Sequence, residues 1–134
     1  MNTLLQQPKF TTTHSFTVFP DDLNYAGTLF GGKLLAEMDI AGAKLTRKLL
    51  YNSPCDGAVT VKVGKVIFKN PAHLGDLIDM DVAATRIGKT SIDMTIKVVK
   101  ESIRGSVESI CEADFTFVAL KEGKPHPHYL KLIK

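Results

Sequence analysis

Apolar and polar residues alternate along most of the second half of the chain. Runs rich in strand-forming residues cover 58–69, 77–86, 90–99 and 105–120, and each is separated from the next by residues typical of turns. An earlier run, 11–19, is rich in β-branched and aromatic residues. Because a period of two is that of a strand with one buried face, the pattern predicts an antiparallel sheet of five strands.

A single segment, from Gly32 to about Tyr51, has the period of a helix instead. Its apolar residues recur on one side at Leu34, Met38, Ala41, Leu45 and Leu49, and others fill the remaining sides of its first half at Leu35, Ala36, Ile40 and Ala43. A helix that is apolar nearly all round is expected to be buried. One buried helix among strands predicts an α+β fold in which a sheet wraps over the helix.

The start of this helix carries the residues best suited to chemistry. Gly31 and Gly32 allow a ligand to approach the free backbone N–H groups, which favour negative charge. Asn24 lies just upstream, and Asp39 lies about two turns into the apolar helix, where a carboxylate is able to activate a water. This layout suits acyl transfer to water. A glycine-rich loop entering a core helix that carries one surface aspartate explains the same residues.

Length and composition predict one globular domain over 1–134, and the segment 121–134 is interpreted as a loosely held tail. The chain has 134 residues, of which 44% are hydrophobic and 23% charged. A net charge of +3 without a run of Lys or Arg argues against a nucleic-acid partner. Cys55 and Cys111 lack metal-ligand spacing and are interpreted as reduced thiols. With no membrane-length apolar run and no signal peptide, we expect a cytoplasmic protein without a membrane partner.

Five short segments together resemble the acyl-CoA thioesterases of the hotdog fold, in the branch of small bacterial acyl-CoA hydrolases and their cytosolic relatives. The segments are P-D-D-L-N-Y-A-G-T-L-F-G-G (20–32), M-D-I-A-G-A (38–43), V-T (59–60), F-K-N-P-A-H-L-G-D (68–76) and G-K-T-S (88–91). The resemblance extends over about residues 15–120, the core of the domain, and implies a long central helix wrapped by an antiparallel sheet. It also implies a homo-oligomer built from dimers, a tetramer or a hexamer, with active sites at the dimer interface.

This chain departs from the family pattern at two positions. Relatives usually place an acidic residue four positions after the threonine of V-T, where this chain has Gly64. They often have an aromatic residue after the glycine pair, where this chain has Lys33. Neither departure falls on Asn24 or Asp39, so the catalytic assignment stands, and both bear on substrate preference.

The resemblance assigns roles to the residues at the helix start. It implies hydrolysis of acyl-CoA thioesters to free acid and coenzyme A, with Asp39 as general base or, alternatively, as nucleophile. The backbone N–H groups of Gly31 and Gly32 would polarise the carbonyl, and Asn24 would orient the water or the thioester. No metal is needed, and coenzyme A enters only as part of the substrate. Asn24 is also explained as a turn residue that stabilises its own loop.

Substrate binding involves two further segments in this family. Thr60 is expected to supply a hydroxyl to the site, although a β-branched strand residue explains it nearly as well. Coenzyme A carries phosphates, and G-K-T-S offers Gly88 for close backbone approach, Lys89 as a point charge, and the hydroxyls of Thr90 and Ser91. An ordinary hairpin turn with a solvated lysine explains the same four residues.

The remaining polar residues are weaker candidates. His14 lies in a strand and is interpreted as a packed or surface residue, and Glu37 is the next carboxylate to test after Asp39. His126 and His128 are separated by one proline, and a metal there would be adventitious. Beside the enzyme, the alternative function is a non-catalytic hotdog module that binds and senses an acyl-CoA.

Overall fold

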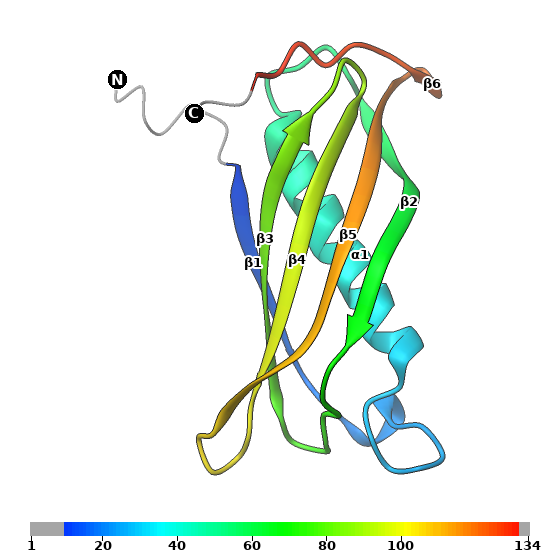
Figure 1. Cartoon of the computed structure of the whole chain (residues 1–134). Helices are drawn as coiled ribbons and strands as arrows, with labels where there is room; N and C mark the ends of the chain where they lie inside the picture. Colours follow the sequence, from blue (N-terminus) through cyan, green and yellow to red (C-terminus); the bar gives the residue numbers. More distant parts are fainter. Residues whose placement is uncertain (1–9, 132–134) are drawn as a thin grey trace.

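One long helix packs against a curved antiparallel sheet in the computed structural model, which describes residues 10–131 (Figure 1). The helix is α1 (Gly31–Leu49), preceded by a short 3-10 helix, η2 (Pro20–Asp22). The strands are β1 (Thr11–Thr17), β2 (Gly57–Phe68), β3 (Leu77–Ile87), β4 (Ser91–Glu101), β5 (Val107–Lys121) and β6 (Lys124–Pro125). The predicted α+β fold, with five main strands and one helix, is confirmed.

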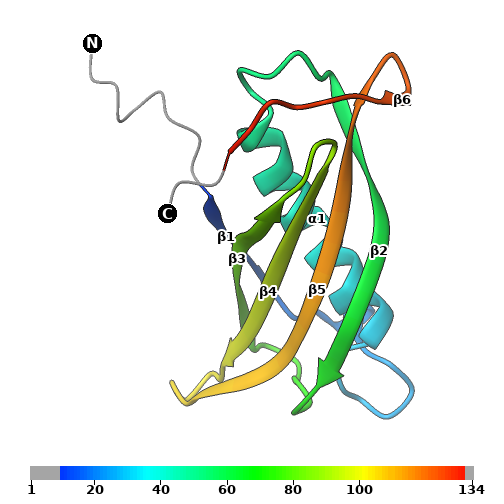
Figure 2. The same ribbon diagram turned by 45° about the horizontal axis from the view of Figure 1, so that its top comes forward.

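The strands follow the order β1-β3-β4-β5-β2, with the short β6 beside β5. Every pairing is antiparallel. The sheet bends around α1, which crosses its concave face, so β1 and β2 form the two edges on either side of the helix (Figure 2). Two register shifts interrupt the pairing of β2 with β5, one between Thr60 and Lys62 and one between Gly64 and Ile67. Such irregularities twist a strand, as wrapping around a helix requires.

The core lies between the helix and the three central strands. Buried and more exposed residues alternate along β3, β4 and the second half of β5, as the sequence pattern predicted. Cys111, Ala113, Phe115 and Phe117 all lie on the buried face. Gly42 faces Phe117, and a Cβ at that position would lie 2.7 Å from an atom of the Phe117 ring. The missing side chain therefore lets the helix and β5 approach closely.

The prediction that the first half of the helix is buried on all sides is wrong for the single chain. Leu34, Met38 and Ala41 are buried, but Ile40 on the other side is 53% exposed. Ala36 and Ala43 are also exposed. The sheet packs against one side of the helix only. The second apolar side is therefore exposed to solvent in the single chain.

The prediction of a loosely held tail from residue 121 is also wrong as far as the described residues reach. The chain turns at Gly123 and runs back across the end of the sheet, where β6 pairs with β5 (Figure 1). His128 is only 2% exposed. Its Nδ1 accepts the backbone N–H of Leu130 at 3.0 Å, so its Nε2 carries the proton and donates to the Ser91 carbonyl, also at 3.0 Å. A buried histidine with both nitrogens satisfied fixes this segment.

Candidate active site

The structure brings two of the predicted site residues into direct contact. The hydroxyl of Thr60, on β2, donates a hydrogen bond of 2.5 Å to Oδ1 of Asp39, in the middle of α1. Asp39 is half-buried and lies on the helix side that faces β2. Because the threonine holds one oxygen, the carboxylate has a fixed orientation while its second oxygen remains able to accept a proton.

The glycine pair begins α1, as predicted. Gly31 lies against the ring of Phe68, and a Cβ on Gly32 would lie 2.5 Å from the Phe30 ring. The helix has no side-chain cap and no acidic residue in its first turn. The first intrahelical bond is the one from the Leu34 N–H to the Phe30 carbonyl. The N–H groups of the glycine pair therefore form no helical hydrogen bond, and within residues 10–131 they are available to an anionic ligand.

Asn24 closes the loop that leads to the helix. Its Oδ1 accepts the N–H groups of Ala26 and Thr28 at 3.0 and 3.1 Å, and its Nδ2 donates to the Thr28 hydroxyl at 3.0 Å. Gly27 completes the turn with a positive φ of 84°. These contacts show Asn24 as a turn residue that stabilises its own loop, which was the alternative interpretation in the sequence analysis. They also hold the amide rigidly at the surface of the loop.

Within one chain these groups do not converge. Gly31 and Asp39 are eight positions apart, which corresponds to roughly 12 Å along the helix axis. Oxyanion donors and a base that act on one carbonyl group must each lie about 3 Å from the reacting atoms. The Asn24 loop lies beyond the N-terminal end of the helix, further still from Asp39 (Figure 1). The residues of the predicted site are therefore not brought together within a single chain.

Glu37, the second carboxylate, lies in a separate charged cluster on the side of β1. His14 contacts one of its oxygens at 2.8 Å, and Lys33 contacts the other at 3.3 Å. Lys33 also pairs with Asp22 at 3.5 Å. The hydrogen bond to Glu37, with the charge of Asp22, raises the pKa of Lys33 above its ordinary value. Glu37 is thus held by Lys33 and His14, and His14 is a packed residue, one of the two interpretations that the sequence analysis gave.

The G-K-T-S segment forms the turn between β3 and β4, at the end of the molecule opposite Gly31 and Gly32 (Figure 1). The N–H of Gly88 donates to the Ser91 carbonyl at 3.0 Å, and a Cβ on Gly88 would lie 2.4 Å from the Ser91 hydroxyl. The N–H of His128 donates to the Lys89 carbonyl at 3.2 Å. Lys89 is exposed and Thr90 is half-buried. This end is separated from the helix start by roughly 28 Å, the length of a 19-residue helix.

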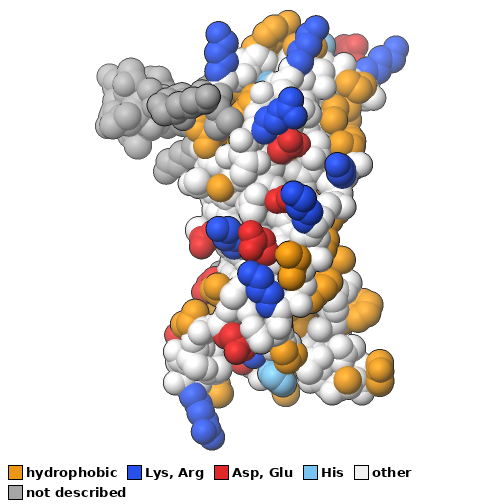
Figure 3. Space-filling model, in the orientation of Figure 1, with side chains coloured by type: hydrophobic (Ala, Val, Ile, Leu, Met, Phe, Trp, Pro, Cys, Tyr) orange, Lys and Arg blue, Asp and Glu red, His pale blue; other side chains and the backbone are white. Residues whose placement is uncertain are grey.

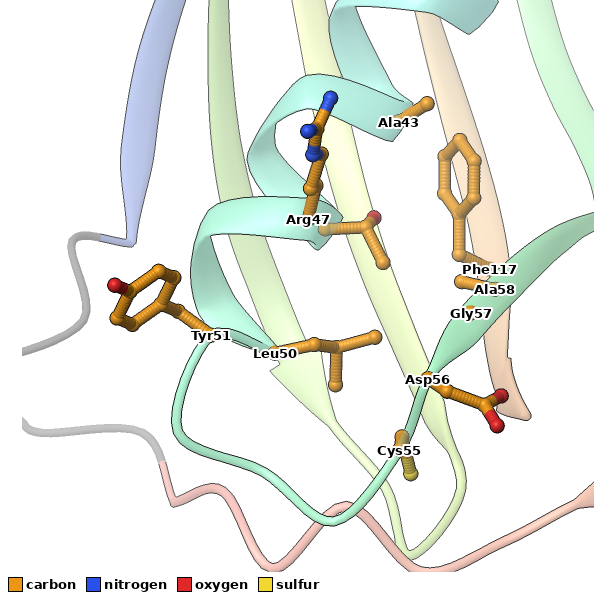
Figure 4. Close-up of a pocket in the computed structure, with 10 residues that line it drawn as sticks. Ala43, Arg47, Leu50, Tyr51, Cys55, Asp56, Gly57, Ala58 and Phe117 are labelled. Carbon is orange, nitrogen blue, oxygen red and sulfur yellow. The ribbon is translucent and has the colours of Figure 1, made fainter. Parts of the chain in front are cut away.

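A cavity that the sequence analysis did not predict lies between the second half of α1 and the start of β2. It has a volume of about 420 Å³. Figure 4 shows that the Leu50 side chain reaches from the helix end toward β2, whereas Tyr51 points away from the other residues. The remaining lining residues are Ala43, Thr46, Arg47, Cys55, Asp56, Gly57, Ala58 and Phe117. The recurrence of Asp39, Ala43 and Arg47 every four residues was the sequence signal that could have indicated it.

Both cysteines are free thiols, as expected. Burial raises the pKa of Cys111, which lies in the core beside Met38. Cys55 lines the cavity, and its thiol donates to the carbonyls of His126 and Pro127 at 3.5 and 3.6 Å. In residues 10–131 no group of three or more His, Cys, Asp or Glu side chains is placed to hold a metal ion. None of the helices in this range is long and apolar enough to cross a membrane.

A single long helix wrapped by an antiparallel sheet is the hotdog fold of thioesterase-like proteins. The family model of the thioesterase superfamily matches residues 26–107. The chain is 33% identical to the acyl-CoA thioester hydrolase YciA of Salmonella typhimurium, over 95% of this chain and 96% of that protein. It therefore belongs to the thioesterase superfamily.

Solved structures agree with this assignment. The hexameric thioesterase y2039 from Yersinia pestis has a TM-score of 0.81 and 30% identity, over 88% of this chain and 94% of that one. An acyl-CoA hydrolase from Staphylococcus aureus, solved in complex with butyryl coenzyme A, coenzyme A and coenzyme A disulfide, has a TM-score of 0.78. It is 26% identical, over 87% of this chain and 70% of that one. The predicted resemblance to hotdog thioesterases is confirmed.

Proposed function

We propose that this protein hydrolyses acyl-CoA thioesters to the free acid and coenzyme A, with Asp39 as the general base. The observation that carries the proposal is the Asp39 carboxylate, half-buried and oriented by the Thr60 hydroxyl. One oxygen accepts the threonine hydrogen bond, and the other takes the proton of a water that attacks the thioester carbonyl. The thiolate of coenzyme A then leaves as the tetrahedral intermediate collapses. The reaction needs neither a metal nor a cofactor.

The oxyanion of this intermediate needs donors that the same chain does not bring to Asp39. The free N–H groups at Gly31 and Gly32 are suited to the task, but they lie roughly 12 Å along the helix from Asp39. A second copy related by a twofold axis, with its helix antiparallel to the first, places its glycine pair and its Asn24 beside Asp39. The site is therefore proposed to be shared between two chains.

The surface of the single chain supports such a dimer. The edge strand β2 exposes apolar side chains, and hydrophobic atoms gather along this edge in the space-filling view (Figure 3). Val59, Val61 and Phe68 are 45%, 54% and 54% exposed. Ile40, on the uncovered side of α1, is 53% exposed. An apolar strand edge left unpaired is a site of association, so we propose that pairs of chains join there.

The described relatives give further support. The Yersinia pestis thioesterase is hexameric, and so is a thioesterase of Campylobacter jejuni that is 33% identical to this chain. Alanine variants of an aspartate, a threonine and an asparagine were the subjects of structures of the Staphylococcus aureus hydrolase. In the numbering of that protein, the asparagine and the aspartate are separated by the same number of positions as Asn24 and Asp39. We propose a hexamer built from three dimers; the cytoplasmic location stays a prediction.

The test is a coupled thiol-release assay with a panel of acyl-CoAs of increasing chain length. We expect hydrolysis that depends on Asp39. The alternative, a sensing module, predicts saturable binding of acyl-CoA without release of thiol. Tight binding with no turnover across the whole panel would exclude the proposed activity.

A further inference from the structure

The C-terminal segment 124–131, called here the strap, lies against the turn between β3 and β4. It begins with β6, which pairs with β5, and then runs across the end of the sheet (Figure 2). The strap carries one polar side chain that is almost fully buried, that of His128, of which 2% is exposed. A buried imidazole needs hydrogen-bond partners for its ring nitrogens, and the partners of His128 indicate what it does.

His128 holds the turn through two carbonyl groups. Its backbone N–H donates to the Lys89 carbonyl at 3.2 Å, and its Nε2–H donates to the Ser91 carbonyl at 3.0 Å. The carbonyl between these two, that of Thr90, accepts the N–H of Ala119 on β5 at 2.8 Å. Three consecutive carbonyl groups of the turn are therefore bonded to the strap or to the sheet.

The N–H groups of the same turn remain available to a ligand. Within residues 10–131, the N–H groups of Lys89 and Thr90 form no hydrogen bond to another residue. Adjacent backbone N–H groups in a turn form a concavity that binds anions. The Lys89 side chain is exposed, and residues 82–92 include no acidic side chain. The turn therefore presents two N–H donors and one cation, which are the groups that bind a phosphate.

We propose that His128 is a positioning residue for the recognition of the coenzyme A phosphates by this turn. The proposal rests on the acyl-CoA hydrolase function above and adds a residue outside the catalytic groups. In a planar trans peptide unit, the N–H points away from the carbonyl of the preceding residue. Because the strap holds the Lys89 carbonyl, the N–H of Thr90 points away from the strap.

The imidazole ring of His128 fixes the strap and the turn to each other. Its Nε2 contact shares the Ser91 carbonyl with the Gly88 N–H, which donates at 3.0 Å and closes the turn. Its Nδ1 accepts the N–H of Leu130, which packs against the core. Loss of the ring contacts therefore frees the turn to move, and its N–H groups are then less well oriented for a phosphate.

The direct test is His128→Leu, which keeps an apolar side chain at this position but removes the ring contacts. The readout is the ratio of kcat/KM for butyryl-CoA to kcat/KM for butyryl-pantetheine, which carries the same thioester without the phosphates. Loss of one hydrogen bond weakens an interaction about fivefold. We therefore expect the ratio to fall about fivefold, through a higher KM for butyryl-CoA.

Two further variants separate the hydrogen bond from packing. His128→Gln places an amide N–H near the position of Nε2 and should return the ratio to within about twofold of the parent. His126→Leu is the matched control, because it makes the same change at the other histidine of the strap. The Nδ1 of His126 contacts the Pro127 carbonyl at 2.9 Å rather than the turn, so the ratio should not change.

A second measurement uses the parent protein and does not depend on the folding of any variant. The probe is adenosine 3′,5′-bisphosphate, which carries phosphates of coenzyme A but no thioester. We expect it to slow amide hydrogen exchange, followed by mass spectrometry, both in residues 88–91 and in residues 126–130. Protection of the two segments together is expected because His128 joins them.

Three outcomes overturn the inference. His128 is not a positioning residue if His128→Leu keeps the parent ratio, if His128→Gln fails to restore it, or if the nucleotide leaves exchange unchanged in either segment. Each result, obtained with a parent protein that releases thiol from butyryl-CoA, leaves the proposed function intact. Failure of the parent to hydrolyse any acyl-CoA removes the proposed function itself.

Discussion

Replacement of Asp39 and of Thr60, singly and together, tests whether the two side chains act as one unit. Asp39→Asn keeps the shape of the side chain and an oxygen that accepts the Thr60 hydroxyl, but removes the base. General bases contribute about 10²–10⁴ to rate, so we expect kcat to fall by that factor while the acyl-CoA still binds. The thiol-release assay gives kcat, and isothermal titration of the variant gives the affinity.

Thr60→Val removes only the hydrogen bond to the carboxylate. A hydrogen bond to a charged group is worth about 1.5–3 kcal/mol, which corresponds to a loss of roughly 10- to 100-fold in kcat/KM. Thr60→Ser restores the hydroxyl and should recover most of this loss, which identifies Thr60 as a positioning residue. If packing of the threonine methyl group rather than the hydroxyl mattered, Thr60→Val would keep its activity and Thr60→Ser would lose it, because only valine retains that methyl group.

The double variant gives the decisive comparison. If Thr60 acts only by orienting Asp39, the double variant falls no further than Asp39→Asn alone, within about threefold. Glu37→Gln is the matched control, because Glu37 is a carboxylate on the same helix that is paired with His14 and Lys33. It should retain kcat within about threefold. An Asp39→Asn protein within tenfold of the parent would refute the role of Asp39 as base.

Three further predictions test the shared site, phosphate recognition and the packing of the helix. Mixing inactive Asn24→Ala and Asp39→Asn proteins should restore up to about a quarter of the parent activity after subunit exchange. Mass spectrometry shows whether the subunits have exchanged. If they exchange and no activity returns, each site lies within one chain. Lys89→Ala should raise KM several-fold with little change in kcat, because the phosphate contact is equal in ground and transition states, and the effect should shrink in high salt. Gly42→Ala should lower the free energy of unfolding, measured in urea, by about 1–2 kcal/mol. The reason is that overpacking against the Phe117 ring outweighs the better helix propensity of alanine. Unchanged stability would show that the ring moves aside at no cost.

The sequence predicted the sheet more accurately than the burial of the helix. Alternation along β3 and β4 identifies which side chains face the core, because in a sheet the period of two fixes the face of every residue. Along α1 the pattern indicated burial on all sides, yet Ile40 is exposed in the single chain. A hydrophobic pattern indicates which side chains are to be buried. It does not indicate whether the residues that bury them belong to the same chain or to a second one.

The sequence predicted only part of the candidate site, because contacts between distant segments leave no local pattern. The Thr60–Asp39 contact joins two residues of different elements, and only the family resemblance brought them together before the structure did. The tail was misjudged because Pro and His are poor strand formers, whereas His128 is held by backbone partners that no local pattern reveals. Packing between distant segments decided both cases.

The proposed dimer explains both the exposed apolar side of α1 and the separation of the predicted site residues. A complete site within one chain would require oxyanion donors close to Asp39. The helix N–H groups of Gly31 and Gly32, however, lie roughly 12 Å away along the axis. Ile40 is 53% exposed beside the apolar edge strand β2, and a contiguous exposed apolar patch marks a site of association. In the proposed dimer, the second copy that covers this surface also delivers the missing donors, so dimer formation and catalysis would depend on the same contact. A substitution that separates the two chains, such as Ile40→Asp, should therefore abolish hydrolysis even though the Thr60–Asp39 pair remains in place.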